Sequence, residues 1–107
     1  MLFLMKASLA KPAGMSNKEF YGVWRKEAEA ALAAQDAGVI KALYKVPGKH
    51  EVIAILEAES ADFLDEAVEG LPIWKMGYSH IVTAIEWTPL RPYKHWADHL
   101  KKLAQEG

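Results

Sequence analysis

The sequence predicts an α+β protein with the element order βαββαβ, followed by a helical tail. Apolar residues recur at helical spacing in two segments, residues 16–38 and 60–70. Four shorter apolar runs surround them, one before the first segment, two between the segments and one after the second. This order is the split-βαβ, or ferredoxin-like, arrangement, in which two helices cover one face of a four-stranded antiparallel sheet.

The first strand and the long helix after it have clear boundaries in the sequence. Residues 1–10 form an apolar run, and the turn residues of the segment Lys11-Pro12-Ala13-Gly14 end it. The helix begins after Ser16, whose hydroxyl can cap the N-terminus, and Glu19 three residues later completes a capping box. Gly38 can end the helix, because glycine adopts the left-handed conformation of a C-terminal cap.

A β-hairpin and a second helix follow. Residues 39–46 and 51–58 are expected to form the two strands of the hairpin, with Pro47-Gly48 in the turn between them. The second helix begins at Ser60, and Gly70 lies at its end. Five apolar residues recur there at helical spacing: Phe63, Leu64, Ala67, Val68 and Leu71.

The fourth strand is expected over residues 78–87, and His80 lies at its beginning. Pro89 and Pro92 are expected to break the chain after this strand, because proline has no backbone N–H to donate. A short terminal helix over residues 93–105 completes the element order.

Length and composition indicate one globular domain. The chain has 107 residues, of which 51% are hydrophobic and 25% charged, and its formal net charge is -1. We expect a single domain over residues 1–107, with a core in residues 1–90 and a tail helix in residues 91–107. The charge balance argues against a nucleic-acid-binding protein, which needs a basic surface. The sequence contains no cysteine, which excludes disulfides, thiolate nucleophiles and cysteine-ligated metal sites.

The sequence shows no targeting or membrane-spanning pattern. The apolar N-terminal run has no basic residues before it, and Lys6 interrupts it after five residues. No stretch approaches the ~18 to 20 apolar residues that span a bilayer. We therefore expect a cytoplasmic protein that has no membrane partner.

Two strands have the composition of strands that are buried on both faces. Residues 2–5 and 52–56 are continuous apolar runs rather than alternating ones. The two helices can cover only one face of the sheet, so we expect a second copy of the chain to cover the other, giving at least a dimer. Four residues of the tail form an apolar stripe that suits docking on a neighbour: Trp96, His99, Leu100 and Leu103.

Glu27 is the strongest candidate for chemistry, because it is a carboxylate on an apolar helix face. At about 100° per residue, it lies near the centre of one stripe. Burial against apolar surface raises the pKa of a carboxyl group and makes its ionised form a stronger base. The alternatives are that Glu27 pairs with a lysine or lies at the edge of the stripe. The other members of the stripe are Phe20, Val23, Trp24, Ala31 and Ala34.

Basic and aromatic residues of the hairpin are candidates for substrate binding. Lys49 and His50 follow the turn, and Tyr44 and Lys45 precede it, so the four can form a cationic rim for a carboxylate ligand. A solvated turn is an equally good interpretation of the same residues.

The remaining candidates are histidines and tryptophans. His95 and His99 lie four residues apart on the tail helix and could share a metal, but no third ligand is evident, so we expect no metal site. His80 can act as an acid or hydrogen-bond donor, or simply end a strand. Trp24 and Trp74 can wall a pocket, or belong to the core.

The sequence resembles the muconolactone delta-isomerase family from residue 1 to about residue 87. The resemblance depends on several weak elements that occur together in register. They are Met1-Leu2-Phe3 with Lys6, Pro12, Met15, the helix segment around Glu27, Gly38, Leu43, Tyr44-Lys45, Gly48, and Leu71-Pro72 with the apolar-aromatic pair after it.

This resemblance implies a ferredoxin-like fold that assembles into dimeric α+β barrels and often into decamers. It also implies a cofactor-free enzyme of aromatic-compound degradation, which converts muconolactone into 3-oxoadipate enol-lactone by moving a ring double bond. The family's proton-transferring glutamate falls on Glu27. The resemblance and the periodicity therefore indicate the same residue.

The sequence departs from the family pattern at Lys49-His50, Lys75-Met76 and Glu86-Trp87, where selectivity for the substrate would be set. We therefore expect an isomerase acting on muconolactone or a related unsaturated lactone. Two alternatives have the same architecture: a small dimeric α+β-barrel dehalogenase or monooxygenase, and a non-catalytic oligomer that binds a small ligand.

Overall fold

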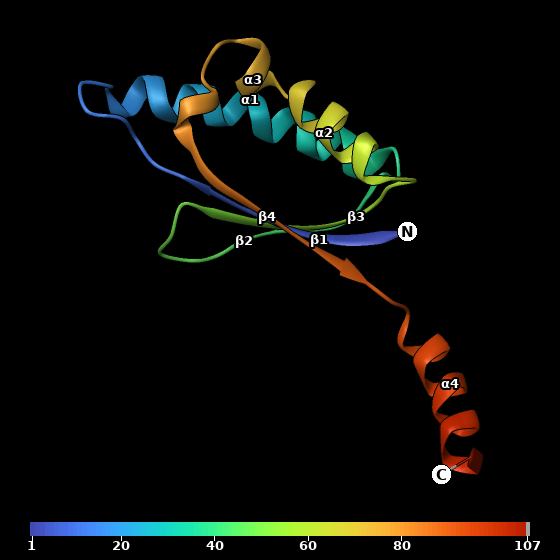
Figure 1. The fold of residues 1–107 in the computed structure, drawn as a ribbon. Coiled ribbons are helices and arrows are strands. Elements are labelled where there is room, and N and C mark those ends of the chain that lie inside the picture. The colour runs from blue at the N-terminus through green and yellow to red at the C-terminus, as the bar shows by residue number, and fades with distance from the viewer. Residues whose placement is uncertain (107) are drawn as a thin grey trace.

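The structure is a computed structural model that describes residues 1–106. It confirms the expected α+β class and the βαββαβ order (Figure 1). The elements are β1 (Leu2–Leu9), α1 (Asn17–Asp36), β2 (Ile40–Lys45), β3 (Glu51–Glu57), α2 (Ala61–Glu69), α3 (Pro72–Lys75), the 3₁₀ turn η1 (Ser79–Ile81), β4 (Val82–Leu90) and α4 (Tyr93–Glu106).

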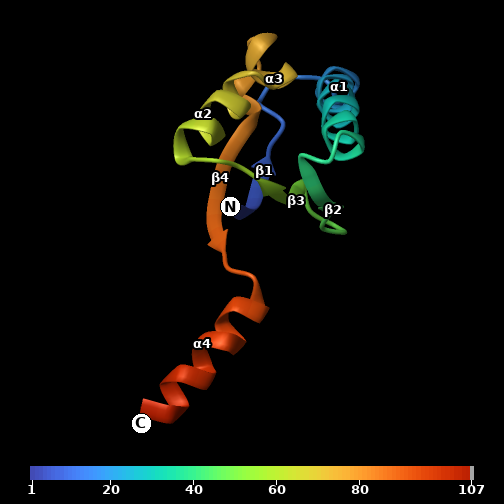
Figure 2. The same cartoon turned by 90° about the vertical axis from the view of Figure 1, so that its right-hand side faces the viewer.

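The four strands form one antiparallel sheet in the order β2-β3-β1-β4. The helices α1, α2 and α3 lie on one face of this sheet, and α4 extends away from it (Figures 1 and 2). The molecule is consequently elongated, with extents of 62 × 27 × 22 Å. Within residues 1–106, no helix is both long and apolar enough to cross a membrane.

The long helix begins as the sequence predicts. The Ser16 hydroxyl accepts a hydrogen bond from the backbone N–H of Glu19 at 3.1 Å. In a capping box the Glu19 carboxylate would accept from the backbone N–H of Ser16. Here it accepts a hydrogen bond from the Tyr78 hydroxyl at 2.9 Å. Gly38 adopts a φ of 84° just beyond the helix, where a side chain would be strained.

The segment between α2 and β4 differs from the prediction. Residues 72–75 form the short helix α3, which begins with proline at its first position. The prediction that His80 begins the fourth strand is wrong, because residues 79–81 form the turn η1 and β4 starts only at Val82. The cause is the turn after α3, where the Tyr78 N–H donates to the Ile73 carbonyl oxygen at 2.8 Å and Gly77 has a φ of 83°.

The prediction that Pro89 ends the strand is also wrong. The strand β4 runs through Pro89, which pairs with Phe3 in the register, and ends at Leu90. A proline is tolerated there because β4 is an edge strand, where a missing N–H leaves no neighbour unpaired.

The core between the helices and the sheet consists of two separate groups of buried side chains. One group lies near the start of β1 and packs against α2; it contains Phe3, Ala54, Leu56, Ala58 and Leu64. The other lies under the first turns of α1 and under α3; it contains Leu9, Phe20, Val23, Ile73 and Ile81.

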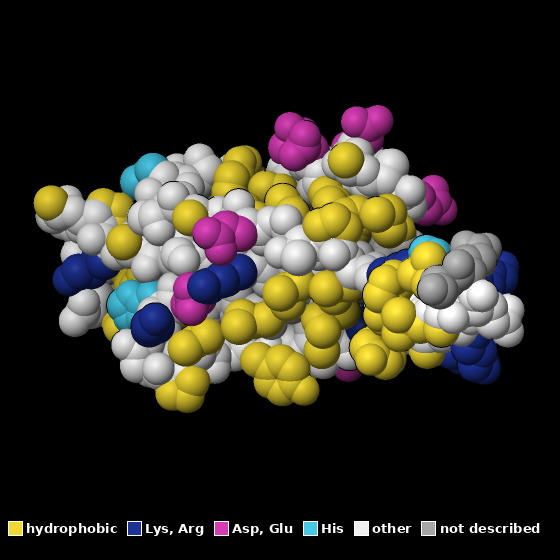
Figure 3. All heavy atoms as spheres, turned by 60° about the horizontal axis from the view of Figure 1, so that its bottom comes forward, with side chains coloured by type: hydrophobic (Ala, Val, Ile, Leu, Met, Phe, Trp, Pro, Cys, Tyr) yellow, Lys and Arg dark blue, Asp and Glu magenta, His cyan; other side chains and the backbone are white. Residues whose placement is uncertain are grey.

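Within residues 1–106, no helix lies over the opposite face of the sheet (Figures 1 and 2). We call it the open face, and its central residues are Leu2, Leu4, Ile53 and Ile55, whose side chains alternate with those of the core. In Figure 3, which brings this side forward, hydrophobic side chains gather over the sheet and again on α4. Trp96, Leu100 and Leu103 of α4 are 37%, 40% and 44% exposed, so the tail stripe has no partner within the described residues.

Candidate active site

A pocket of about 270 Å³ lies between the helices and the sheet. Small side chains create it: at six lining positions, on α1, α2, β1 and β3, the residue is alanine where a larger side chain would fill the space. These alanines are Ala7, Ala30, Ala31, Ala34, Ala54 and Ala67. The pocket is therefore built into the layer that a fully packed core would occupy.

Glu27 is the ionisable residue of the pocket wall; all other described residues that line the pocket have apolar side chains. It lies on the face of α1 that also carries the buried residues Phe20 and Val23. The helical periodicity of the sequence therefore placed Glu27 on the correct side of the helix.

The Glu27 carboxylate is only partly solvated and has one hydrogen-bond donor. The backbone N–H of Ile73 in α3 donates to its Oε1 at 3.3 Å. Burial raises the pKa of Glu27 above its ordinary value of 4.5, and the hydrogen bond from Ile73 offsets part of that rise. Among the described residues no lysine, arginine or histidine forms an ion pair with Glu27. The alternative in which Glu27 pairs with a lysine is therefore not observed.

A second hollow borders the pocket on the outer side of α1 and β2. Its volume is about 320 Å³, and it shares five lining residues with the pocket: Trp24, Glu27, Ala31, Leu43 and Val52. Tyr44 and Lys45 line this hollow but not the pocket. The Glu27 carboxylate therefore lies on the boundary between an apolar pocket and a wider, more polar rim.

The structure brings together three of the predicted site residues around the pocket. Trp24 and Trp74 line it together with Glu27, on α1 and α3. The indole ring of Trp24 also meets the His50 ring edge to face, with centroids 5.5 Å apart. Both tryptophans are half-buried, which suits a wall that limits the access of water.

The other predicted site residues lie outside the pocket. Lys49 and His50 are exposed near the hairpin turn, and the Nε2 of His50 is 3.4 Å from the Tyr21 hydroxyl. His80 is exposed and stacks on Tyr78. Within residues 1–106, no group of three or more His, Cys, Asp or Glu side chains is arranged for a metal.

Sequence reasoning missed two features of the site. It did not identify Ile73 as the donor to Glu27, because a backbone N–H leaves no signal in residue type. It also did not interpret the alanines as a pocket, although Ala30, Ala31 and Ala34 occur at helical spacing beside Glu27. That spacing was the available signal.

Comparison with known proteins identifies relatives of this architecture. A family model described as muconolactone delta-isomerase matches residues 1–95. A crystal structure of muconolactone isomerase is similar with a TM-score of 0.69 at 22% identity, covering 86% of this chain and 90% of that one.

A second solved structure is 5-chloro-2-hydroxyhydroquinone dehydrochlorinase from Burkholderia phenoliruptrix, in complex with 2,5-dihydroxybenzoquinone. It has a TM-score of 0.57 at 22% identity, covering 89% of this chain and 98% of that one. At this level of identity the two structures show a common fold. No curated protein matches the chain.

Proposed function

This chain belongs to the muconolactone delta-isomerase family, and on that premise we propose that it is a cofactor-free isomerase of unsaturated lactones. It would shift a ring double bond in muconolactone or a related lactone by proton transfer through Glu27. The observation that carries this proposal is the position of Glu27, a carboxylate in the wall of an otherwise apolar pocket.

The proposed reaction needs one group that accepts and then returns a proton. The Glu27 carboxylate removes a proton from the saturated ring carbon attached to the conjugated C=C–C=O system of the lactone, and the C–H electron pair enters that system as a dienolate. Protonated Glu27 then delivers the proton to another carbon of that system, which moves the double bond and regenerates the carboxylate. A raised pKa suits both steps, because a general base is most effective when its pKa lies near the working pH.

The walls of the pocket support this chemistry. Trp24 and Trp74 flank the site and limit its contact with water, which strengthens electrostatic interactions inside. The indole N–H groups of the lining tryptophans, Trp87 included, are uncharged donors of the kind that stabilise a developing enolate oxygen.

The second part of the proposal concerns assembly. A second copy of the chain would cover the open face, in agreement with the apolar side chains at its centre and with the unpartnered stripe of α4. This arrangement is the dimeric α+β barrel that the sequence suggests, and it is compatible with larger assemblies such as a decamer.

Turnover of muconolactone by the Glu27→Gln variant tests the mechanism. The variant keeps the size of the side chain and removes its basicity, so we expect turnover to fall by about 10²-fold or more. The loss of muconolactone would be followed by ultraviolet absorbance with EDTA present.

Glu29→Gln is the matched control, because Glu29 lies on the same helix, is exposed and pairs with Arg25. The control should retain wild-type turnover. Wild-type turnover in the Glu27→Gln variant would remove Glu27 from the mechanism.

A dehydrochlorinase is the second candidate function, because the chain has the fold of the dehydrochlorinase structure and the same base could expel a chloride from a chlorinated ring. Release of chloride from a chlorinated hydroquinone would support this candidate. Ligand binding without turnover of either substrate class would support the non-catalytic alternative.

A further inference from the structure

We propose that the substrate of this pocket is an uncharged cyclic carbonyl compound, such as an unsaturated lactone or enone that carries no carboxylate. The inference rests on the proposed function, since it concerns the molecule on which Glu27 acts. It differs from the muconolactone assignment in one respect: muconolactone itself carries a carboxylate.

The first argument is the charge of the pocket wall. Among the described residues of the wall, only Glu27 is ionisable, and it is an anion when it acts as a base. A substrate carboxylate in the same pocket would be desolvated without a cation to pair with, and it would be repelled by Glu27. Removal of a proton from such a substrate would add an enolate charge beside a carboxylate. An uncharged substrate avoids both penalties.

The second argument is the placement of the nearest cations. Lys45 lines the outer hollow and not the pocket, and its Nζ donates to the Val46 carbonyl oxygen at 3.2 Å. Lys49 is exposed near the hairpin turn, and the His50 ring contacts Tyr21 and Trp24 rather than the pocket. The cationic rim that the sequence suggests therefore lies outside the apolar pocket: Lys45 borders only the outer hollow, which Glu27 lines as well.

The third argument is size. A pocket of about 270 Å³ is slightly smaller than most ligand sites, which usually occupy about 300–1,000 Å³. It accommodates one ring with a short substituent. Because the rest of the wall is aliphatic and aromatic, that substituent is expected to be apolar.

The experiment compares three lactones that share one ring and differ in charge. Muconolactone has the carboxylate, its methyl ester lacks the charge but is longer, and β-angelica lactone has a methyl group in its place and is shorter. Binding would be measured at neutral pH by quenching of tryptophan fluorescence, since Trp24, Trp74 and Trp87 line the pocket. Turnover would be measured on the same samples by ultraviolet absorbance.

We expect both uncharged lactones to bind at least about tenfold more tightly than muconolactone, and to be turned over with at least about tenfold higher kcat/KM. A longer and a shorter neutral ligand with the same advantage exclude size as the cause. Glu27→Gln should then improve the binding of muconolactone and leave the binding of the ester unchanged, because the variant removes only the repulsion.

The outcomes separate the two proposals. Muconolactone that binds as tightly as the ester, or more tightly, would overturn the inference, and so would a failure of both neutral lactones to bind. Tight binding of the neutral lactones without isomerisation would leave the inference standing and overturn the proposed function instead.

Discussion

The two faces of the sheet are made by the same strands, yet they differ in the size of their side chains. On the face under the helices, Ala7 and Ala54 line a pocket. On the open face, Leu4 and Ile55 stand directly opposite each other in the register of β1 and β3. At these positions both faces are apolar. Residue volume therefore separates a face that contains a pocket from a face that suits a flat interface.

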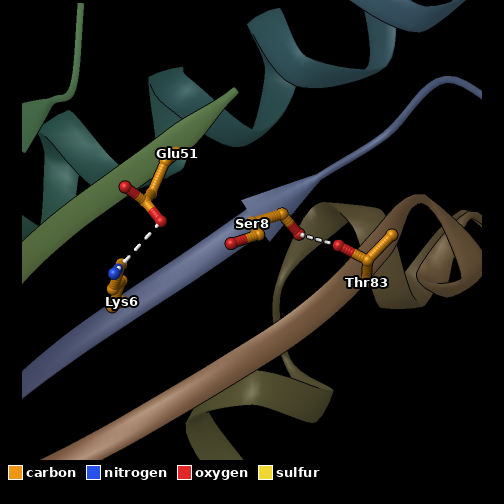
Figure 4. Close-up of polar contacts among 4 residues, drawn as sticks. All are labelled: Lys6, Ser8, Glu51 and Thr83. Atoms are coloured by element: carbon orange, nitrogen blue, oxygen red, sulfur yellow. Dashed lines mark hydrogen bonds and ion pairs between the residues drawn. The ribbon is translucent and has the colours of Figure 1, made fainter. Parts of the chain in front are cut away.

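The carboxylates on the two sides of the sheet also differ, because the one on the open face has a cationic partner and, within residues 1–106, Glu27 on the helix side does not. Lys6 of β1 pairs with Glu51 of β3 at 3.4 Å, and nearby the Thr83 hydroxyl donates to the Ser8 carbonyl oxygen at 3.2 Å (Figure 4). The carboxylate of Glu27, by contrast, has a single backbone donor. The charge of Glu51 is therefore compensated by a neighbouring cation, whereas among the described residues Glu27 has no ion-pair partner.

The largest effect is expected from a charge on the open face. If a second copy covers it, Ile55→Lys buries an unpaired cation at a cost of about 3–5 kcal/mol, which weakens association by at least about 10²-fold. Sedimentation velocity would show the shift toward monomer. Ala33→Lys, on the exposed side of α1, is the control. If the Ile55→Lys variant assembles as the wild type does, the open face is not the interface.

A smaller effect is expected from filling the pocket. Ala31→Leu places a larger side chain beside Glu27, so turnover and lactone binding should fall by about tenfold or more, while the free energy of unfolding rises by about 0.5–2 kcal/mol. Urea unfolding and lactone titration measure the two effects. Ala33→Leu should change neither, because Ala33 lies outside both hollows. Unchanged lactone binding in the Ala31→Leu variant would show that the ligand lies elsewhere.

The pH dependence of stability tests the environment of Glu27 without a substrate. The pKa of Glu27 is raised in the folded protein above the value of 4.5 that it has in the unfolded chain. At a pH between the unfolded and the folded pKa, the folded chain therefore binds more protons than the unfolded chain. This group therefore lowers stability as the pH rises through that window. Urea midpoints of wild type and Glu27→Gln between about pH 4 and pH 8 should diverge with rising pH, with the variant relatively more stable. Parallel curves would mean that Glu27 is solvated.

The smallest effect is expected from the contact between α1 and the turn after α3. The Tyr78 hydroxyl donates to Glu19, and this bond raises the pKa of Tyr78. It joins α1 to the turn that follows α3, the helix whose Ile73 N–H donates to Glu27. Tyr78→Phe should weaken the hydrogen bond from the Ile73 N–H to Glu27. The carboxylate then loses stabilisation, its pKa rises, and the acid limb of the pH–rate profile moves slightly to higher pH. An unchanged profile would show that Ile73 is held independently of Tyr78.

Local patterns predicted most of the fold. The cap at Ser16 and the end of α1 near Gly38 were predictable, because each depends on the chemistry of one or two residues. The positions of Glu27 and Trp24 on the pocket side of α1 were predictable from the helical stripe, because helical spacing is also a local property of the chain. The predictions failed at His80 and Pro89, where the outcome depends on the turn after α3 and on the edge position of β4.

By itself, the sequence determined the element order, the orientation of α1 and the place of Glu27 on its buried face, because periodicity and capping act over a few residues. Only the tertiary structure decided that alanines from four elements leave a pocket, that Ile73 donates to Glu27, and that Lys49 and His50 lie outside the wall. These features depend on how distant segments pack, and packing is set by the volumes of side chains that meet across the core.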